Sequence, residues 1–356
     1  MEKSIGIQSV AAYLPETVRT NDFWPAEVVA QWRERMASML PRAEALPADS
    51  TEGMRLTMEA LLALRDDPFQ GARERRVVAD DMLSSDMEVR AATMALEQAG
   101  VGVGDVDLLI THTMVPDYLE VNSASIVQHK LGVRRDCLSF GIDAVCTSFL
   151  LQLQLAEQMI RSGQARRALV TQSSACSRLG PWEQPFSAHL GDCATALVIG
   201  EVDSGRGFLG RHFESDGSLH AGFVATVPGK RWYDDGKVVA ASEDKAAARK
   251  MQLHAADTAK RVIGAALEKS GVAPRDVRFI ATHQPSVWLT RIIKQYCGLD
   301  NAGRVETFPW AANAMSSNIP LQLAFASREG LLSAGDPIAM FTVASGMTAA
   351  SGIVRW

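Results

Sequence analysis

The chain contains an internal repeat, and this feature restricts its possible folds more than any other. Residues 96–112 read LEQAGVGVGDVDLLITH, and residues 267–283 read LEKSGVAPRDVRFIATH. The same offset pairs the run ALVT at 168–171 with AMFT at 339–342. Each copy reads as a helix, a turn with glycine, a buried apolar strand and a Thr-His pair. The repeat therefore predicts two copies of one structural unit.

Strands alternate with helices along both copies, which predicts parallel βαβ units and sheets covered on both faces. The apolar runs at 106–110 and 279–281 are short enough for strands. Helices are predicted at 87–99, 148–162, 245–270, 286–297 and 321–333. We divide the chain into an N-terminal half, 1–203, and a C-terminal half, 204–356, which share one interface.

Residues 25–70 have no counterpart in the second half. The segment is charged, contains four methionines and has helical spacing. Two interpretations remain open at this point. The segment is either a helical pair packed on the surface or a lid over a binding tunnel.

Composition describes an ordinary globular protein, since 47% of the 356 residues are hydrophobic and 22% are charged. The formal net charge of −5 disfavours a nucleic-acid partner, which usually requires a basic excess. The longest uncharged run lies between Asp336 and Arg355, but Pro337, Gly346 and Gly352 interrupt it. Two strands joined by a tight turn are therefore predicted there, and not a membrane span.

The location of the protein is predicted from its first residues and its cysteines. The start, MEKSIGIQSV, lacks the sustained apolar run of a signal peptide. Five cysteines form no CxxC pair, which predicts free thiols in a reducing compartment. We therefore expect a cytoplasmic protein with no membrane partner.

Candidate catalytic residues follow the carboxyl ends of strands, where function concentrates in α/β sheets. Cys146 lies between an expected strand at 139–142 and a helix that begins near residue 148. At a helix N-terminus the macrodipole lowers a thiol's pKa. His283 follows the strand that begins at Phe279, and Asn313 follows a strand expected at 305–308. Thiolate, imidazole and carboxamide are the parts of a covalent acyl-transfer site.

Each candidate taken alone also has a structural interpretation. Cys146 fits a buried small hydrophobe, His283 a structural histidine, and Asn313 a helix cap. Their placement favours function, because Cys146 and His283 follow strands in opposite halves. If the repeat reflects a pseudo-two-fold axis, equivalent strand ends converge near that axis. The repeat offset maps Cys146 onto Ser317, so one nucleophile per chain is expected. The other thiols are interpreted as structural: Cys137, Cys176, Cys193 and Cys297.

Other motifs carry less weight. Residues 205–210 match GxGxxG, but a strand-like segment follows them where dinucleotide binding requires a helix. The chain shows no metal-ligand spacing, so no metal is expected.

Several motifs together resemble the β-ketoacyl-ACP synthase III branch of the thiolase superfamily. They are DAVCTSF around Cys146, THQ around His283, Asn313 seven residues before Pro320, HLGDCATA from 189 and GARERR from 71. The resemblance covers nearly the whole chain except about 25–70. It implies a thiolase-like five-layered α-β-α-β-α fold made of two duplicated halves, a homodimer, and a catalytic triad of Cys146, His283 and Asn313.

Departures from the family pattern point to a particular branch. Alanines flank Asn313, Pro285 follows THQ, and the C-terminal glycine turn reads Ala-Ser-Gly at 344–346. This turn and the string DYLE at 117–120 resemble the head-to-head branch, which joins two acyl chains. That resemblance implies that Glu120 enters the partner's active site, where it is the candidate base. The alternative is that Glu120 is a solvated loop carboxylate.

The predicted reaction has two stages. Cys146 takes an acyl group from a CoA or carrier-protein thioester, with the backbone N–H groups of Cys146 and Gly346 as the oxyanion hole. A second thioester, malonyl or acyl, then undergoes Claisen condensation in fatty-acid-derived or polyketide metabolism. CoA or phosphopantetheine thioesters are substrates, and no other cofactor is expected. Two alternatives remain: an acyltransferase that makes an ester or amide, and a catalytically silent subunit of a heterodimer.

Overall fold

Two β-sheets form the frame of the molecule. The computed structural model describes residues 4–39, 46–181 and 183–356. The first sheet has the order β1-β7-β6-β4-β5, with strands Ile5–Tyr13, Asp192–Glu201, Ala168–Ala175, Leu108–Thr113 and Leu138–Gly141. The second sheet has the order β11-β12-β13-β8, with strands Phe279–Thr282, Pro337–Val343, Thr348–Arg355 and Gly207–Ser215.

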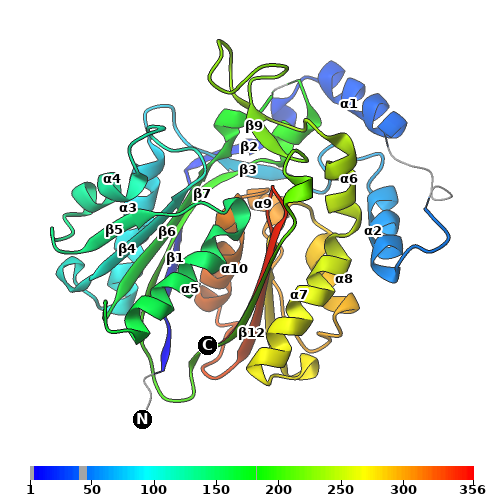
Figure 1. The fold of residues 1–356 in the computed structure, drawn as a ribbon. Helices are drawn as coiled ribbons and strands as arrows, with labels where there is room; N and C mark the ends of the chain where they lie inside the picture. The colour runs from blue at the N-terminus through cyan, green and yellow to red at the C-terminus, as the bar shows by residue number, and fades with distance from the viewer. Residues whose placement is uncertain (1–3, 40–45, 182) are drawn as a thin grey trace.

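Helices fill three layers around these sheets (Figure 1). α5 (Ser148–Arg161) and α10 (Asn318–Arg328) lie between the two sheets. The outer face of the first sheet packs against α3 (Ser84–Ala99) and α4 (Ser123–Leu131), and that of the second against α7 (Ala255–Ser270) and α8 (Leu289–Tyr296). The five-layered α-β-α-β-α fold predicted from the sequence is confirmed.

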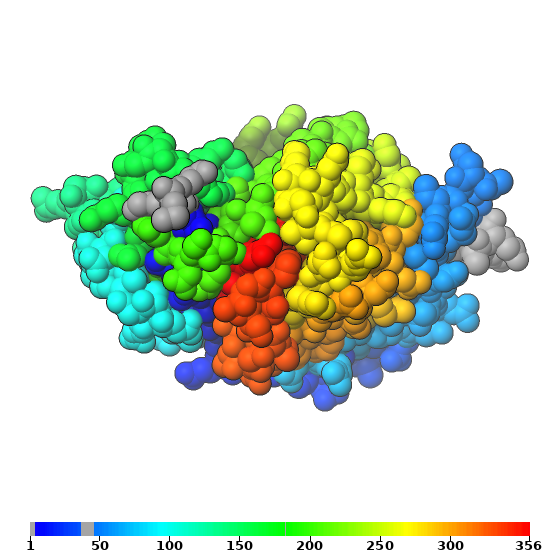
Figure 2. Space-filling view, turned by 90° about the horizontal axis from the view of Figure 1, so that it is seen from below, coloured from blue at the N-terminus to red at the C-terminus, as the bar shows by residue number. Residues whose placement is uncertain are grey.

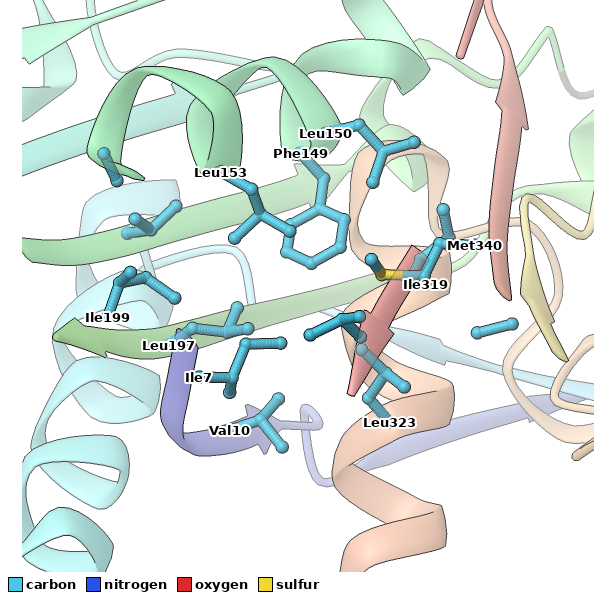
Figure 3. Packing of buried hydrophobic residues seen from close by; sticks show 14 of the residues in the cluster. Ile7, Val10, Phe149, Leu150, Leu153, Leu197, Ile199, Ile319, Leu323 and Met340 are labelled. Carbon is cyan, nitrogen blue, oxygen red and sulfur yellow. The ribbon is translucent and has the colours of Figure 1, made fainter. Parts of the chain in front are cut away.

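The largest hydrophobic core lies between the sheets (Figure 3). Phe149 and Leu153 of α5 meet Leu323 of α10 there, together with Leu197 of the first sheet and Met340 of the second. A single core therefore joins the two halves of the chain, and the predicted boundary at 203/204 lies in the loop between β7 and β8.

Strand directions correct part of the prediction. β4 pairs in parallel with β5 and β6, and β11 pairs in parallel with β12, as expected for βαβ units. The remaining pairs of both sheets are antiparallel. β12 and β13 show the physical reason, because the turn at 344–347 is too short for the crossover that parallel strands require. This pair confirms the two strands predicted for the uncharged C-terminal run.

Other local predictions needed correction. The helix predicted at 245–270 is divided into α6 (Lys245–Leu253) and α7, because His254 has non-helical dihedral angles. The strand expected at 305–308 is absent, and Phe308 begins the short helix α9 (Phe308–Ala311). The GxGxxG match enters strand β8, which agrees with its interpretation as a coincidence.

The segment 25–70 forms a helical pair, α1 (Ala26–Met39) and α2 (Glu52–Ala63). Trp32 of α1 packs with Trp24 and Phe69, and Leu61 of α2 packs in the cluster under α7 and α8. Figure 2 shows the blue α2 region against the orange residues of the second half. The segment is thus helical, and whether it acts as a lid or only as a packed surface pair stays a prediction. Two-stranded sheets complete the fold: β2 (Thr17–Thr20) with β3 (Glu74–Val77), and β9 (Val224–Thr226) with β10 (Val239–Ala241).

The five cysteines all lie in the described ranges and are free thiols, as predicted. No helix formed by residues 4–39, 46–181 and 183–356 combines the length and the apolarity that a membrane span requires.

Candidate active site

Cys146 lies in a tight turn immediately before α5. The turn is a 3₁₀ helix, Val145–Thr147, and Val145 has a φ of +51°, which a β-branched residue rarely adopts. Contacts from the second sheet hold the turn in place. The Thr342 hydroxyl donates to the Cys146 carbonyl at 3.1 Å, and the Thr147 hydroxyl donates to the Thr348 carbonyl at 2.9 Å. The position of the sulfur therefore depends on both halves of the chain.

Burial dominates the electrostatics of the sulfur. Burial raises the pKa of the Cys146 thiol to about 12, while hydrogen bonds from the backbone N–H groups of Cys146 and Ser345 act to lower it. The expectation of a pKa lowered by the helix dipole is therefore wrong for the resting protein. The free energy needed to remove the thiolate from water is larger than the stabilisation that the dipole at the start of α5 provides.

The turn between the last two strands of the second sheet also contacts Cys146. The backbone N–H of Ser345 donates to the Cys146 sulfur, and the N–H of Gly346, one residue later, stays a predicted donor to the oxyanion. Both residues lie in the turn between β12 and β13, where Gly346 has a φ of +74° and Met347 a φ of +52°. These two left-handed residues determine which N–H of the turn faces the sulfur, and a sequence motif does not specify this direction.

The raised pKa predicts how Cys146 reacts with an alkylating reagent. Only the thiolate reacts, so we expect the alkylation rate with iodoacetamide to rise about tenfold per pH unit between pH 7 and pH 10. Intact-protein mass spectrometry with peptide mapping measures the rate at this residue, and Cys146→Ser identifies its signal. A plateau below pH 8 would contradict a thiol that is protonated at rest.

His283 directly follows β11 and is buried, with 5% of its surface exposed. Its backbone N–H donates to the Phe341 carbonyl of β12 at 2.8 Å, which fixes the residue at the sheet edge. Burial lowers the pKa of His283 to about 4, and a hydrogen bond with the Met315 backbone acts in the opposite direction. The imidazole is therefore neutral at pH 7.

Asn313 is placed by an unusual crossing of two loops. Its backbone N–H donates to the His189 carbonyl at 2.9 Å, and its carbonyl accepts from the Gly191 N–H at 3.1 Å. A Cβ on Gly191 would lie 1.8 Å from the Ala311 carbonyl oxygen, so only glycine permits this approach. The HLGD motif therefore has a physical role, since it brings the Asn313 loop into position.

The accepting end of the Asn313 side chain is turned toward its own loop. Its Oδ1 accepts from the Met315 N–H at 2.9 Å and from Asn318 Nδ2 at 2.7 Å. Because the amide is planar, its NH₂ group points away from these donors. The NH₂ group is then the part of the side chain that can meet a substrate oxygen.

Shared neighbours bring the three predicted residues together. Cys146 Sγ lies 3.9 Å from Met315 Sδ, and the Met315 N–H donates to Asn313. Asn318 Nδ2 lies 2.9 Å from His283 Nδ1 and 2.7 Å from Asn313 Oδ1. A sulfur, an imidazole and a carboxamide from both halves therefore belong to one buried contact network.

Sequence reasoning missed three members of this network: Met315, Asn318 and Ser345. The repeat contained a signal for the first two. Its offset maps Ser317 onto Cys146, so the segment before α10 occupies the position equivalent to the nucleophile turn. No comparable signal singles out Ser345.

The structure places Glu120 away from this buried network. It lies on the exposed loop between β4 and α4, beside Tyr118, Leu119 and Val121, which are 62%, 79% and 49% exposed. The loop is anchored by Asp117, which accepts hydrogen bonds from the N–H and hydroxyl of Ser85. Within one chain Glu120 is therefore a surface carboxylate.

Comparison with known proteins gives the family. A model of 3-oxoacyl-[acyl-carrier-protein] synthase III matches residues 140–217, the model of its C-terminal part matches 267–356, and the thiolase N-terminal domain matches 72–172. β-Ketoacyl-[acyl-carrier-protein] synthase III of Thiobacillus denitrificans is 30% identical over 287 residues, covering 80% of this chain and 88% of that protein. The Rhodospirillum centenum synthase III is 31% identical over 294 residues, with the same coverage of both chains.

Solved structures share the fold over the whole chain. Aquifex aeolicus 3-oxoacyl-[acyl-carrier-protein] synthase III aligns with a TM-score of 0.79 at 23% identity, covering 99% of this chain and 100% of that one. Xanthomonas campestris OleA, crystallised with lauric acid and lauroyl-CoA, aligns with a TM-score of 0.77 at 20% identity and full coverage of both chains. The chain belongs to the β-ketoacyl-[acyl-carrier-protein] synthase III family of thiolase-like acyltransferases, and it is a thioester-condensing enzyme.

Proposed function

We propose that Cys146 accepts an acyl group from a CoA or carrier-protein thioester and that a second thioester then condenses with it. The observation that carries this proposal is the buried contact network that links Cys146, His283 and Asn313. One nucleophile and two donors are the parts that a two-stage condensation needs.

In the first stage the Cys146 sulfur attacks the carbonyl carbon of the donor thioester. The backbone N–H groups of Cys146 and Gly346 would donate to the oxyanion that forms, and each such donor contributes about 3 kcal/mol. The bond to the donor sulfur then breaks. CoA or phosphopantetheine leaves as a thiol with the proton that Cys146 loses, and the acyl group stays on Cys146.

In the second stage another thioester becomes an enolate, by loss of CO₂ from a malonyl unit or by loss of an α-proton. His283 and the Asn313 NH₂ would donate to the enolate oxygen, and the α-carbon would attack the Cys146 thioester and release the sulfur. A carboxamide is no base. Condensation without decarboxylation therefore needs a further group to take the α-proton. We propose Glu120 of a second copy as this base.

Exposed apolar surface supports a homodimer that would supply this group. β5 is an edge strand of the first sheet, and its Leu138 is 52% exposed. Tyr118, Leu119 and Val121 add further exposed apolar surface around Glu120. An edge strand beside an exposed apolar patch is typical of a surface that binds another protein. A second copy of the chain would bury the edge of β5 and the patch together.

Exchange of subunits tests the role of Glu120. We expect Glu120→Ala to leave acylation of Cys146 unchanged and to lower condensation of two acyl-CoA molecules roughly 100-fold or more, because the base is lost. A mixed dimer of Glu120→Ala and Cys146→Ala subunits should regain activity, since one of its sites holds both groups. Glu97→Ala, an exposed glutamate on α3, is the matched control.

The second substrate decides how this test is interpreted. Condensation with malonyl-CoA should survive Glu120→Ala, because loss of CO₂ forms the enolate without a base. Unchanged product from two acyl-CoA molecules would make Glu120 a solvated loop carboxylate. An ester or amide product, with no new carbon–carbon bond between the two acyl groups, would favour the alternative acyltransferase.

The setting of the reaction is also a proposal. Five free cysteines fit a reducing compartment, so we propose the cytoplasm. Relatives are named as synthases that act with acyl carrier protein. We propose the same class of thioester partner for this chain, in fatty-acid-derived or polyketide metabolism.

A further inference from the structure

Asn318 is a fully buried amide at the first position of α10. The orientation of its side chain is fixed by the backbone, because Oδ1 accepts from the Ala314 N–H at 3.2 Å. A backbone N–H can only donate, so this contact identifies the oxygen end of the amide. The Met315 N–H identifies the oxygen end of Asn313 in the same way, at 2.9 Å.

The nitrogen end of Asn318 therefore faces both predicted donors of the active site. Nδ2 lies 2.9 Å from His283 Nδ1 and 2.7 Å from Asn313 Oδ1. An amide NH₂ has two hydrogens and accepts nothing, so each of these contacts is a donation from Asn318. His283 Nδ1 must accept, which places the proton of the neutral ring on Nε2.

The equivalent histidine in the first half shows that the partner decides the tautomer. The repeat offset maps His283 onto His112, which also follows the repeat's buried strand segment. His112 Nδ1 lies 3.2 Å from the Ile142 carbonyl oxygen and 3.7 Å from an oxygen of Asp143. Both neighbours only accept, so the proton of His112 is on Nδ1. Equivalent positions therefore hold opposite tautomers.

The repeat also shows why the first half lacks this arrangement. Its offset maps Asn318 onto Thr147. The Thr147 hydroxyl donates to the Thr348 carbonyl, and it is tied to the second sheet in this way. The amide at position 318 is thus a feature of the second half alone, where the predicted catalytic imidazole lies.

We propose that Asn318 is a positioning residue that holds the His283 proton on Nε2 and turns the Asn313 NH₂ group toward the substrate. One side chain then sets both donors to the enolate oxygen, and it keeps His283 from acting as a base. The catalytic consequence rests on the proposed function, whereas the tautomer of His283 does not.

The tautomer is measured directly in the intact protein. Long-range ¹⁵N–¹H correlation spectra of protein labelled at histidine distinguish a proton on Nε2 from one on Nδ1, and His283→Ala assigns the signal among the seven histidines. At pH 7 we expect His283 to carry its proton on Nε2 and His112 on Nδ1. A wild-type His283 with its proton on Nδ1 overturns the inference, whatever the activity.

Asn318→Asp keeps the shape of the side chain and replaces its NH₂ group with a carboxylate oxygen. The oxygen that accepts from Ala314 is retained, but the group facing His283 Nδ1 becomes an acceptor, so we expect the proton to move to Nδ1. Gln322→Glu is the matched control: it is a buried amide one turn further along α10. Its side chain bonds the backbone of Thr282 and the backbone carbonyl of Asn318, and not the His283 ring. We expect it to lower stability and to leave the His283 tautomer unchanged.

The rates of acylation and condensation distinguish a positioning role of Asn318 from a purely structural one. We expect Asn318→Asp to lower condensation at least about 100-fold, the loss of an aligned donor, while Cys146 acylation changes less than about threefold. Equal losses in both stages would reduce Asn318 to a structural residue. An enzyme that no thioester acylates would end the proposed function and leave the tautomer result standing. If Asn318→Asp does not fold, the wild-type tautomer still decides the inference.

Discussion

Cys146→Ala should carry no acyl group after incubation with an acyl-CoA, whereas the wild-type protein should gain the mass of one acyl group per chain. The chain offers one thiol that meets the backbone N–H of Ser345 and lies within the contact network of His283 and Asn313. Without it no covalent intermediate forms, and condensation should fall roughly 10⁴-fold or more. Intact-protein mass spectrometry measures the adduct directly.

A buried cysteine elsewhere provides the control for this variant. Cys137 is 4% exposed and packs in the cluster between the first sheet and its outer helices. Cys137→Ala should therefore keep the full acyl adduct and the full condensation rate. An undiminished adduct on Cys146→Ala would show that another residue is the nucleophile, and the mechanism proposed for this site would end.

His283→Ala and Asn313→Ala should each spare the first stage and block the second. In the proposed mechanism the oxyanion of acylation accepts from backbone N–H groups, whereas both of these side chains donate to the enolate. Loss of one such donor lowers the condensation rate by about 100-fold to 1,000-fold. The measurement is a single turnover in which the pre-acylated variant receives the second thioester.

The exposed amide Asn301 supplies the control for these two variants. Its side chain donates to the Arg275 carbonyl, and Asn301→Ala should leave both stages unchanged. A proportionate loss of acylation in His283→Ala and Asn313→Ala would mean that these residues support Cys146 and not the enolate. Unchanged condensation would remove them from the mechanism.

The sequence predicted those parts of the site that depend on the order of elements. The sequence placed Cys146 after a strand of the first half and His283 after a strand of the second, and the core shared by the two halves brings these segments together. The spacing of hydrophobic residues does not show where a single residue breaks or begins a helix. It therefore missed the break at His254, and it gave a strand where Phe308 begins a helix.

The electrostatics of the site could not be predicted from local sequence. The dipole of α5 is a local property, but burial raises the pKa of Cys146. Segments distant in the chain pack on the sulfur, as Met315 does at 3.9 Å. Desolvation depends on this tertiary packing and outweighs the local effect. The same burial lowers the pKa of His283.

Several turns of the site adopt conformations that their residues rarely take. Val145, Ala312, Met315 and Met347 all have φ between +51° and +53°. Sequence preferences do not predict a positive φ for valine or methionine. Tertiary packing imposes this conformation, which these residues rarely adopt by themselves. These turns direct Cys146, Asn313 and the Ser345 N–H, which is why the sequence did not indicate Ser345.

The mass of the product tests the central claim most directly. Wild-type protein acylated at Cys146 with a ¹³C-labelled acyl group is freed of excess donor and then given an unlabelled second thioester. The account predicts that the label leaves Cys146 and appears in one product in which a new carbon–carbon bond joins both acyl chains. Label released only as a free acid, an ester or an amide would contradict it.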